Sequence, residues 1–155
     1  MRLSACSWIF GPQPIGDVFD HLARAGYDGV ELLAEPEQYP LHQIKPLLEQ
    51  TGLRVSSLTG GAGWPRADRD LANPDPANRA RAVAYFKEVL HYGAELGAGC
   101  VVVCPNAVGK IRPIGSYADE WRFAVESCQA LLETSAQTGV RLALEVLNRY
   151  ESWML

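Results

Sequence analysis

A glutamate at the end of an apolar segment is the residue in this sequence best placed to do chemistry. Glu145 closes the segment 140–145, and Glu151 follows six residues later in a Leu-Asn-Arg-Tyr-Glu run. A carboxylate can bind a hard divalent cation through oxygen, and it can remove a proton from carbon or return it. Both glutamates are therefore candidates for acid–base or metal chemistry, although one carboxylate alone makes a poor metal site.

Two tryptophans are candidates for binding a small molecule. Trp8 follows the first apolar segment, and Trp64 lies in the long glycine- and proline-containing loop 59–75. Long loops of this kind commonly cover the binding site in barrel enzymes, and an aromatic ring can form the wall of a sugar pocket. Trp8 and Trp64 are therefore predicted to bind substrate, with ordinary loop packing as the alternative for each.

Apolar strand-like segments alternate with helical patterns along the whole chain. Each helical pattern ends at a glycine shortly before the next apolar segment, as expected where a helix stops in a left-handed turn. Such alternation predicts an α/β fold of parallel (β/α) repeats with right-handed crossovers. The expected strands are 3–9, 29–33, 54–58, 100–104 and 140–145, with four helices between them.

The segment after the first strand favours part of a barrel over an open dinucleotide-binding sheet. Residues 7–12 read Ser-Trp-Ile-Phe-Gly-Pro, whereas a glycine-rich phosphate loop is expected there in the open sheet. We therefore predict the first five strands and four helices of a TIM barrel. In that fold, functional side chains lie at the C-terminal ends of the strands, where Glu145 and Trp8 fall.

The helix boundaries have recognisable capping residues. Asp75 followed by Pro76 predicts the start of the third helix, and Ser116 followed by Asp119 predicts the start of the fourth. We expect the fourth helix to run as one element to the glycine that precedes the fifth strand. Its inward-facing residues are expected to be Trp121, Val125, Cys128 and Leu132.

Three further charged residues have structural or functional interpretations. Glu31 lies inside the second strand, where a charge needs a partner. Arg54 or another basic residue is the favoured partner, and contact with a substrate is the alternative. Lys110 and Arg112 lie in the loop after the fourth strand. They could contact the phosphate of a phosphorylated substrate, and solvated loop charges are the alternative.

The bulk composition favours a cytoplasmic protein with one domain, residues 1–155. The net charge is -4, which argues against a nucleic-acid partner. No apolar run is long enough for a membrane span, and no signal peptide is expected. The four cysteines show no CxxC pair and are interpreted as reduced, buried thiols.

Several segments resemble the sugar isomerase/epimerase superfamily built on the xylose-isomerase-like TIM barrel. The segments are 25–32 (Ala-Gly-Tyr-Asp-Gly-Val-Glu-Leu), 70–82, 96–98 and 144–151 (Leu-Glu-Val-Leu-Asn-Arg-Tyr-Glu). The last is similar to ketose 3-epimerases of the D-tagatose/D-psicose type. The resemblance spans essentially the whole chain.

The resemblance implies a divalent-metal-dependent sugar isomerase or epimerase. It implies that Glu145 binds the metal, usually Mn²⁺ with Mg²⁺ or Co²⁺ possible, and acts as one of two catalytic acid/bases. It also implies that Glu151 contacts hydroxyl groups of a sugar or sugar phosphate. The family's remaining Asp, His and Glu ligands come from later strands, which lie beyond residue 155.

Other functions remain open at this stage. The chain could be a non-catalytic half-barrel, and its unpaired first and fifth strands would favour a homo-oligomer. The loop 105–115 departs from the epimerase pattern, which leaves chemistry like that of hydroxypyruvate isomerase or inosose dehydratase. The metal-dependent nucleases of the superfamily are disfavoured, because no histidine follows the third or fourth strand.

Overall fold

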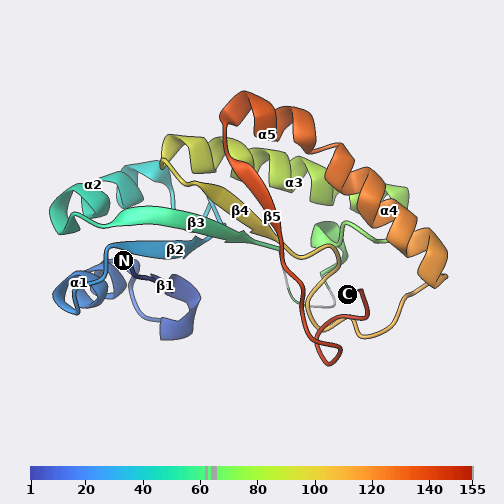
Figure 1. Ribbon diagram of the computed structural model, residues 1–155, viewed down its shortest axis with the longest axis horizontal. Helices are drawn as coiled ribbons and strands as arrows, with labels where there is room; N and C mark the ends of the chain where they lie inside the picture. Colours follow the sequence, from blue (N-terminus) through green and yellow to red (C-terminus); the bar gives the residue numbers. More distant parts are fainter. Residues whose placement is uncertain (62, 64–65, 155) are drawn as a thin grey trace.

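The protein is built on a parallel sheet of five strands. The computed structural model describes residues 1–61, 63 and 66–154. The strands are β1 (Ser4–Cys6), β2 (Gly29–Leu33), β3 (Arg54–Gly60), β4 (Cys100–Val103) and β5 (Arg141–Leu144). Their order in space follows their order in the chain, and each neighbouring pair is parallel (Figure 1). The predicted class, parallel (β/α) repeats forming part of a barrel, is confirmed.

Helices form every crossover between the strands. They are α1 (Ile15–Arg24), α2 (Leu41–Thr51), α3 (Pro76–Glu95), α4 (Tyr117–Gln129) and α5 (Leu132–Thr138), with short 3₁₀ segments η1 (Ser7–Phe10) and η2 (Ala67–Arg69). In Figure 1, α3, α4 and α5 lie together on one side of β4 and β5. Within the described residues, no helix has the length and apolar character needed to cross a membrane.

The predicted helix ends are confirmed, with one difference in the fourth crossover. The Asp75 carboxylate accepts the Ala77 N–H at 2.9 Å, and the Ser116 hydroxyl accepts the Asp119 N–H at 3.1 Å. Gly139 adopts a left-handed conformation with φ of 71° and ends α5. The fourth crossover, expected to be one helix, is instead divided into α4 and α5 at residues 130–131.

The first strand is shorter than predicted. The expected strand 3–9 ends at Cys6, and Ser7–Phe10 turn into η1. The Ser7 hydroxyl accepts the Leu33 N–H at 3.0 Å, so a side chain replaces the backbone as the partner of β2 at this point. The turn places Trp8 beyond the end of the strand.

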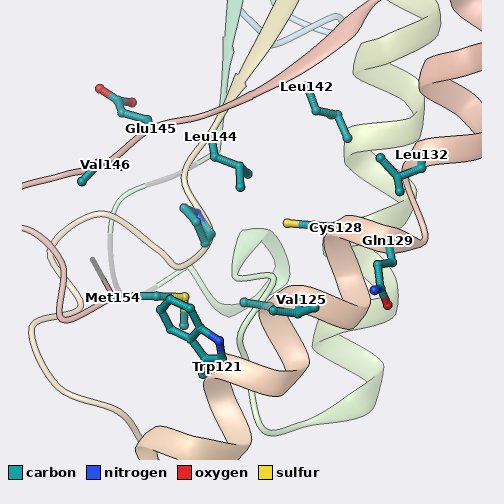
Figure 2. A pocket seen from close by; sticks show the side chains of 12 residues that line it. Trp121, Val125, Cys128, Gln129, Leu132, Leu142, Leu144, Glu145, Val146 and Met154 are labelled. Atoms are coloured by element: carbon teal, nitrogen blue, oxygen red, sulfur yellow. The ribbon is translucent and has the colours of Figure 1, made fainter.

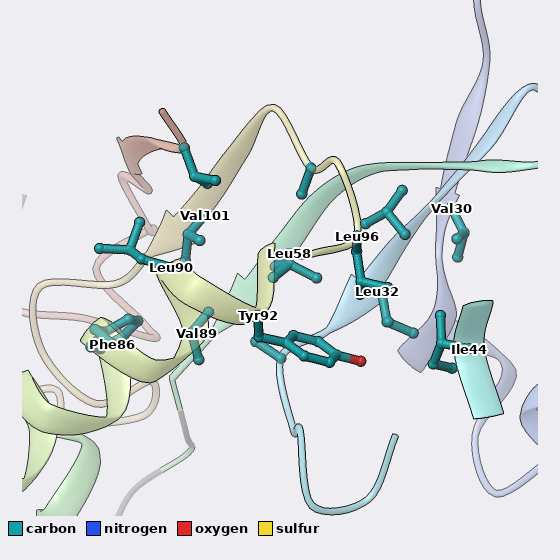
Figure 3. Packing of buried hydrophobic residues seen from close by; sticks show 14 of the residues in the cluster. Val30, Leu32, Ile44, Leu58, Phe86, Val89, Leu90, Tyr92, Leu96 and Val101 are labelled. Atoms are coloured by element: carbon teal, nitrogen blue, oxygen red, sulfur yellow. The ribbon is translucent and has the colours of Figure 1, made fainter. Parts of the chain in front are cut away.

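The hydrophobic core lies between the sheet and its helices. One side of the sheet presents fully buried Val30, Leu32, Leu58 and Val101 to the helices. Figure 3 shows these side chains packed with residues of α2 and α3, among them Ile44, Phe86, Val89 and Leu90. Each such side chain stabilises the fold by about 1.5–3 kcal/mol through its removal from water.

The outer surface of α4 differs from the prediction. Trp121, Val125 and Leu132 were expected to face inward, yet 51%, 43% and 58% of their surfaces are exposed. The buried side of α4 carries Glu120, Ala124 and Ser127 instead. Glu120 lies 2.6 Å from Lys110 in a buried ion pair, whereas Arg122 and Glu126 on the same helix are exposed.

The other face of the sheet carries polar side chains. Because successive residues of a strand point to opposite faces, the residues between the core positions share the second face. Cys6, Glu31, Ser57 and Thr59 lie there as hydrogen-bonded neighbours. The sheet thus offers a polar face next to the strand ends where functional residues are expected.

Gly29 is predicted to be intolerant of a side chain. A Cβ atom at this position would lie 2.6 Å from the Arg54 carbonyl oxygen in the neighbouring strand. Gly29→Ala should therefore lower the free energy of unfolding by about 1–3 kcal/mol, as measured in urea. Gly99→Ala is the control, because its Cβ would meet the Ser56 carbonyl oxygen at an ordinary 3.6 Å. Equal stabilities of the two variants would contradict this explanation.

Candidate active site at the strand ends

Glu145 lies directly after β5 and continues the backbone hydrogen bonding of β5 with β4. Its backbone N–H donates to the Val103 carbonyl at 3.0 Å, and its side chain is exposed. The Cys104 thiol donates to Glu145 Oε2 at 3.3 Å. Figure 2 shows the carboxylate pointing away from the side chains of Leu142 and Leu144. The ladder therefore fixes the backbone of Glu145 and leaves its carboxylate accessible.

Cys104 is a neutral hydrogen-bond donor to this carboxylate. Burial raises the pKa of the thiol to about 12, and the hydrogen bond to Glu145 and the charges of Glu145 and Glu151 act in the same direction. A thiol with such a pKa stays protonated and does not act as a nucleophile.

Glu151 lies in a turn that is attached to the loop after β4. Its N–H donates to the Asn148 carbonyl at 2.9 Å, and the Asn148 amide donates to Glu151 Oε2. The Gly109 N–H donates to the Glu151 carbonyl at 2.6 Å. The exposed carboxylate of Glu151 therefore extends from a backbone that is held on both sides.

Glu31 has neutral partners, and the predicted pairing with Arg54 is wrong. Its carboxylate accepts hydrogen bonds from Thr59 at 2.6 Å, Ser57 at 2.7 Å and the Cys6 thiol at 3.0 Å. Burial alone would raise the pKa of Glu31, but these three donors outweigh it and lower the pKa below its ordinary value. Hydroxyl groups on the neighbouring strand replace the expected cation, because β2 and β3 face each other at these positions.

The other predicted site residues have different outcomes. Trp8 is 56% exposed in η1, just beyond β1, while Trp64 lies outside the described residues. Lys110 was expected to face solvent or a phosphate, but only 2% of its side chain is exposed, so that expectation is wrong. Arg112 is exposed.

An apolar hollow lies beside the strand end on the helix side. It has a volume of about 430 Å³, and Glu145 lies at its margin (Figure 2). Its lining is apolar apart from Glu145 and Gln129. It includes the exposed residues Trp121, Val125, Leu132, Leu144 and Val146, together with half-buried Leu142 and buried Met154. A sugar needs hydrogen-bonding groups, so this hollow is not suited to one. A large exposed apolar surface instead marks a contact surface.

No complete metal site is present in residues 1–61, 63 and 66–154. No three His, Cys, Asp or Glu side chains are grouped there in a way that would hold an ion. Glu145 is an accessible oxygen donor, which suits a hard cation, but it stands as a single ligand.

Comparison with known proteins decides the family. Residues 19–155 match the family described as xylose isomerase-like TIM barrel. The chain belongs to this family. The 3-dehydro-D-guloside 4-epimerase of Escherichia coli is 26% identical over 163 residues, covering 100% of this chain and 60% of that protein. The D-psicose 3-epimerase of Ruminiclostridium cellulolyticum is 27% identical over 143 residues, covering 88% of this chain and 47% of that protein.

Solved structures show the same fold. The D-psicose 3-epimerase with D-tagatose from Clostridium cellulolyticum H10 matches with a TM-score of 0.85 at 22% identity, covering 100% of this chain and 55% of that one. The E. coli 3-keto-D-glucoside 4-epimerase matches with a TM-score of 0.79 at 24% identity, covering 97% and 58%. The chain thus spans about half the length of the proteins it matches.

Sequence reasoning missed two groups of residues at this site. Cys104 was interpreted as a buried thiol, although the register that pairs Val103 with Leu144 places Cys104 opposite Glu145. The second group is the buried set Asp70, Lys110 and Glu120, whose members lie far apart in the sequence. The strand register was a usable signal for Cys104, whereas nothing in the local sequence indicated the second group.

Glu31→Gln tests the hydrogen bonds that hold this carboxylate. A lowered pKa in the folded state gives a stabilisation that is present above the ordinary carboxyl pKa and is lost as the pH falls through the folded-state value. We expect Gln to lower the free energy of unfolding by about 1–2 kcal/mol at pH 7, with a smaller loss at pH 4. Urea unfolding at both pH values measures this, with exposed Glu133→Gln as control. If Glu31→Gln lost the same free energy of unfolding at both pH values, the three donors would not be stabilising the charged form of Glu31.

Cys104 should resist alkylation. A pKa of about 12, against an ordinary 9.0, leaves little thiolate at pH 8. We expect iodoacetamide to modify Cys104 about 100-fold more slowly in the folded chain than in urea, because the thiolate is the reactive form. Peptide mass spectrometry after timed quenching measures both rates. Similar rates in the folded and unfolded chain would show that the thiol is accessible and ionised.

Proposed function

We propose that this chain is the part of a sugar isomerase or epimerase that supplies one catalytic carboxylate, Glu145. The supporting observation is the accessible carboxylate at the C-terminal end of β5, hydrogen-bonded to a thiol that stays protonated. Strand ends of this kind hold the catalytic residues in barrel enzymes. The related proteins named above are sugar epimerases, which gives the reaction class.

Glu145 would act as a general base and acid at one face of the sugar. It takes a proton from the carbon next to a carbonyl, the C–H electron pair forms the new C=C bond, and the carbonyl pair moves to oxygen to give a cis-enediolate. Return of a proton to the opposite face by a second acid inverts the centre. One carboxylate performs half of this exchange.

Neighbouring residues prepare Glu145 for that role. The Cys104 thiol occupies Oε2 as a hydrogen-bond donor, and it favours one orientation of the carboxylate without forming an ion pair. Glu151 would contact substrate hydroxyls, because its exposed carboxylate extends from a turn that is docked on the loop after β4. Trp8, exposed beyond β1, would form a wall of the sugar site, and the same role is proposed for Trp64.

A divalent cation is part of the proposal, with Glu145 as one of its ligands. Mn²⁺ is the proposed ion, and Mg²⁺ and Co²⁺ are the alternatives. When bound, such an ion supplies a Lewis acid that stabilises the charge on the enediolate oxygens. The described residues offer no complete ligand set, so the part played by this chain is restricted to Glu145.

The domain organisation, the cellular location and the kind of substrate belong to the same proposal. We assign residues 1–155 as one domain, the N-terminal half of an eight-stranded barrel, acting in the cytoplasm on a small sugar or sugar phosphate and without nucleic acid. A non-catalytic half-barrel that associates with a second copy is the alternative. The exposed edges β1 and β5 and the apolar surface of α4 favour association of the isolated chain.

Exchange of the substrate proton with solvent tests the function. We expect little turnover by the 155-residue chain alone, and Mn²⁺-dependent exchange of the ketose C3 proton into D₂O when the chain is joined to the second half of a related barrel. Glu145→Gln in the joined protein should slow this exchange by about 100-fold or more, since it removes a positioned base. Exposed Glu133→Gln is the control. Exchange that is unchanged in Glu145→Gln would remove Glu145 from the mechanism.

A further inference from the structure

A buried lysine lies beside the proposed site and has two acidic partners. Lys110 Nζ is 2.7 Å from Asp70 Oδ2 and 2.6 Å from Glu120 Oε2, and these side chains are 2%, 0% and 0% exposed. Lys110 donates a hydrogen bond to Asp70. Its contact with Glu120 Oε2 is an ion pair without hydrogen-bond geometry. Burying three charges is costly unless each is paired. Moving any one of these side chains away would leave a buried charge without a partner, so the three hold one another in place.

The three residues come from separate parts of the chain. Asp70 precedes α3 and also accepts the Ala72 N–H at 3.1 Å, while Glu120 lies in the first turns of α4. Glu120 Oε1 accepts the N–H groups of Ile114 at 2.5 Å and Gly115 at 2.8 Å. Lys110 therefore joins the loop after β4 to the loop after β3 and to the start of α4.

The backbone around Lys110 holds the segment that carries Glu151. The Lys110 carbonyl accepts the Trp153 N–H at 3.3 Å, and the Gly109 N–H donates to the Glu151 carbonyl at 2.6 Å. Lys110 and Ser152 form an isolated parallel bridge. The buried Ser152 hydroxyl lies 2.6 Å from Asn106 Oδ1, and the Asn106 amide donates to the Lys110 carbonyl at 3.1 Å. Asn106, Gly109 and Lys110 thus dock the tail after β5.

We propose that Lys110 is a positioning residue, whose ion pairs with Asp70 and Glu120 hold the loop after β4 and, through it, the segment that carries Glu151 in place beyond the strand ends. Its ammonium group is buried and does not reach substrate, so it acts through the backbone that it anchors. The assignment of Glu151 to substrate hydroxyls rests on the proposed function, whereas the docking of the tail does not.

Site-resolved amide exchange by NMR tests the docking. The variants are Lys110→Met and the neutral triple variant Asp70→Asn/Lys110→Met/Glu120→Gln, which avoids leaving unpaired buried carboxylates. Lys45→Met is the matched control, because Lys45 is paired with Glu95 at 2.8 Å but is exposed. We expect exchange at the Gly109 and Trp153 amides to become about 10-fold faster or more in both Lys110 variants, through local opening. Exchange at the Ala34 amide, which pairs with Thr59, should change less than about two-fold.

The outcomes separate a positioning role from general stability. The proposal would be overturned if amide exchange accelerated equally at Ala34, or if it did not accelerate at Gly109 and Trp153. If Lys110→Met does not fold, the exchange rates of the triple variant decide. In the joined protein described above, Lys110→Met should raise KM for the ketose more than it lowers kcat. If KM is unchanged although amide exchange shows that the tail is no longer docked, the docking does not place Glu151 for contact with the substrate. If the unmodified joined protein has no turnover, the proposed function fails, and the exchange data still decide the role of Lys110.

Discussion

The parallel hydrogen-bond ladder is the constraint on which the rest of the structure depends. It brings the C-terminal ends of β1–β5 to one edge of the sheet and fixes which side chains stand next to each other there. The register between β4 and β5 sets Cys104 opposite Glu145, and that between β1 and β2 sets Cys6 opposite Glu31. The alternation of side chains then sends the apolar residues towards the helices and leaves the polar ones on the other face.

Two different arrangements stabilise charge near this edge. Glu31 and Glu145 accept hydrogen bonds from neutral hydroxyl or thiol groups, which hold a carboxylate without cancelling its charge. Lys110 instead lies buried between two carboxylates and serves to connect loops. The difference fits the roles proposed for Glu145 and Lys110, because a carboxylate that is to exchange protons with a substrate must stay accessible, whereas an anchor works best when water is excluded.

The sequence predicted most of the fold because its signals are local. Helix caps at Asp75 and Ser116 and the glycine that ends α5 depend only on neighbouring residues, and they were confirmed. The side of α4 that faces inward was predicted wrongly, because the local apolar pattern could not show that Glu120 pairs with the buried Lys110. For the site, the position of Glu145 at a strand end was predictable. Its contact with Cys104 needed the strand register, and the partners of Lys110 needed the tertiary structure.

The central claim is that the functional end of this chain lies beyond β5, at Glu145 and the turn that carries Glu151. Paramagnetic line broadening by substoichiometric Mn²⁺ tests it most directly in the protein joined to the second half of a related barrel, with NMR signals observed across residues 1–155. The account predicts that the strongest broadening falls on residues 145–151 and on Cys104, and that Glu145→Gln removes it. Broadening centred elsewhere, for example around the exposed carboxylates of α4, or broadening that survives in Glu145→Gln, would contradict the account.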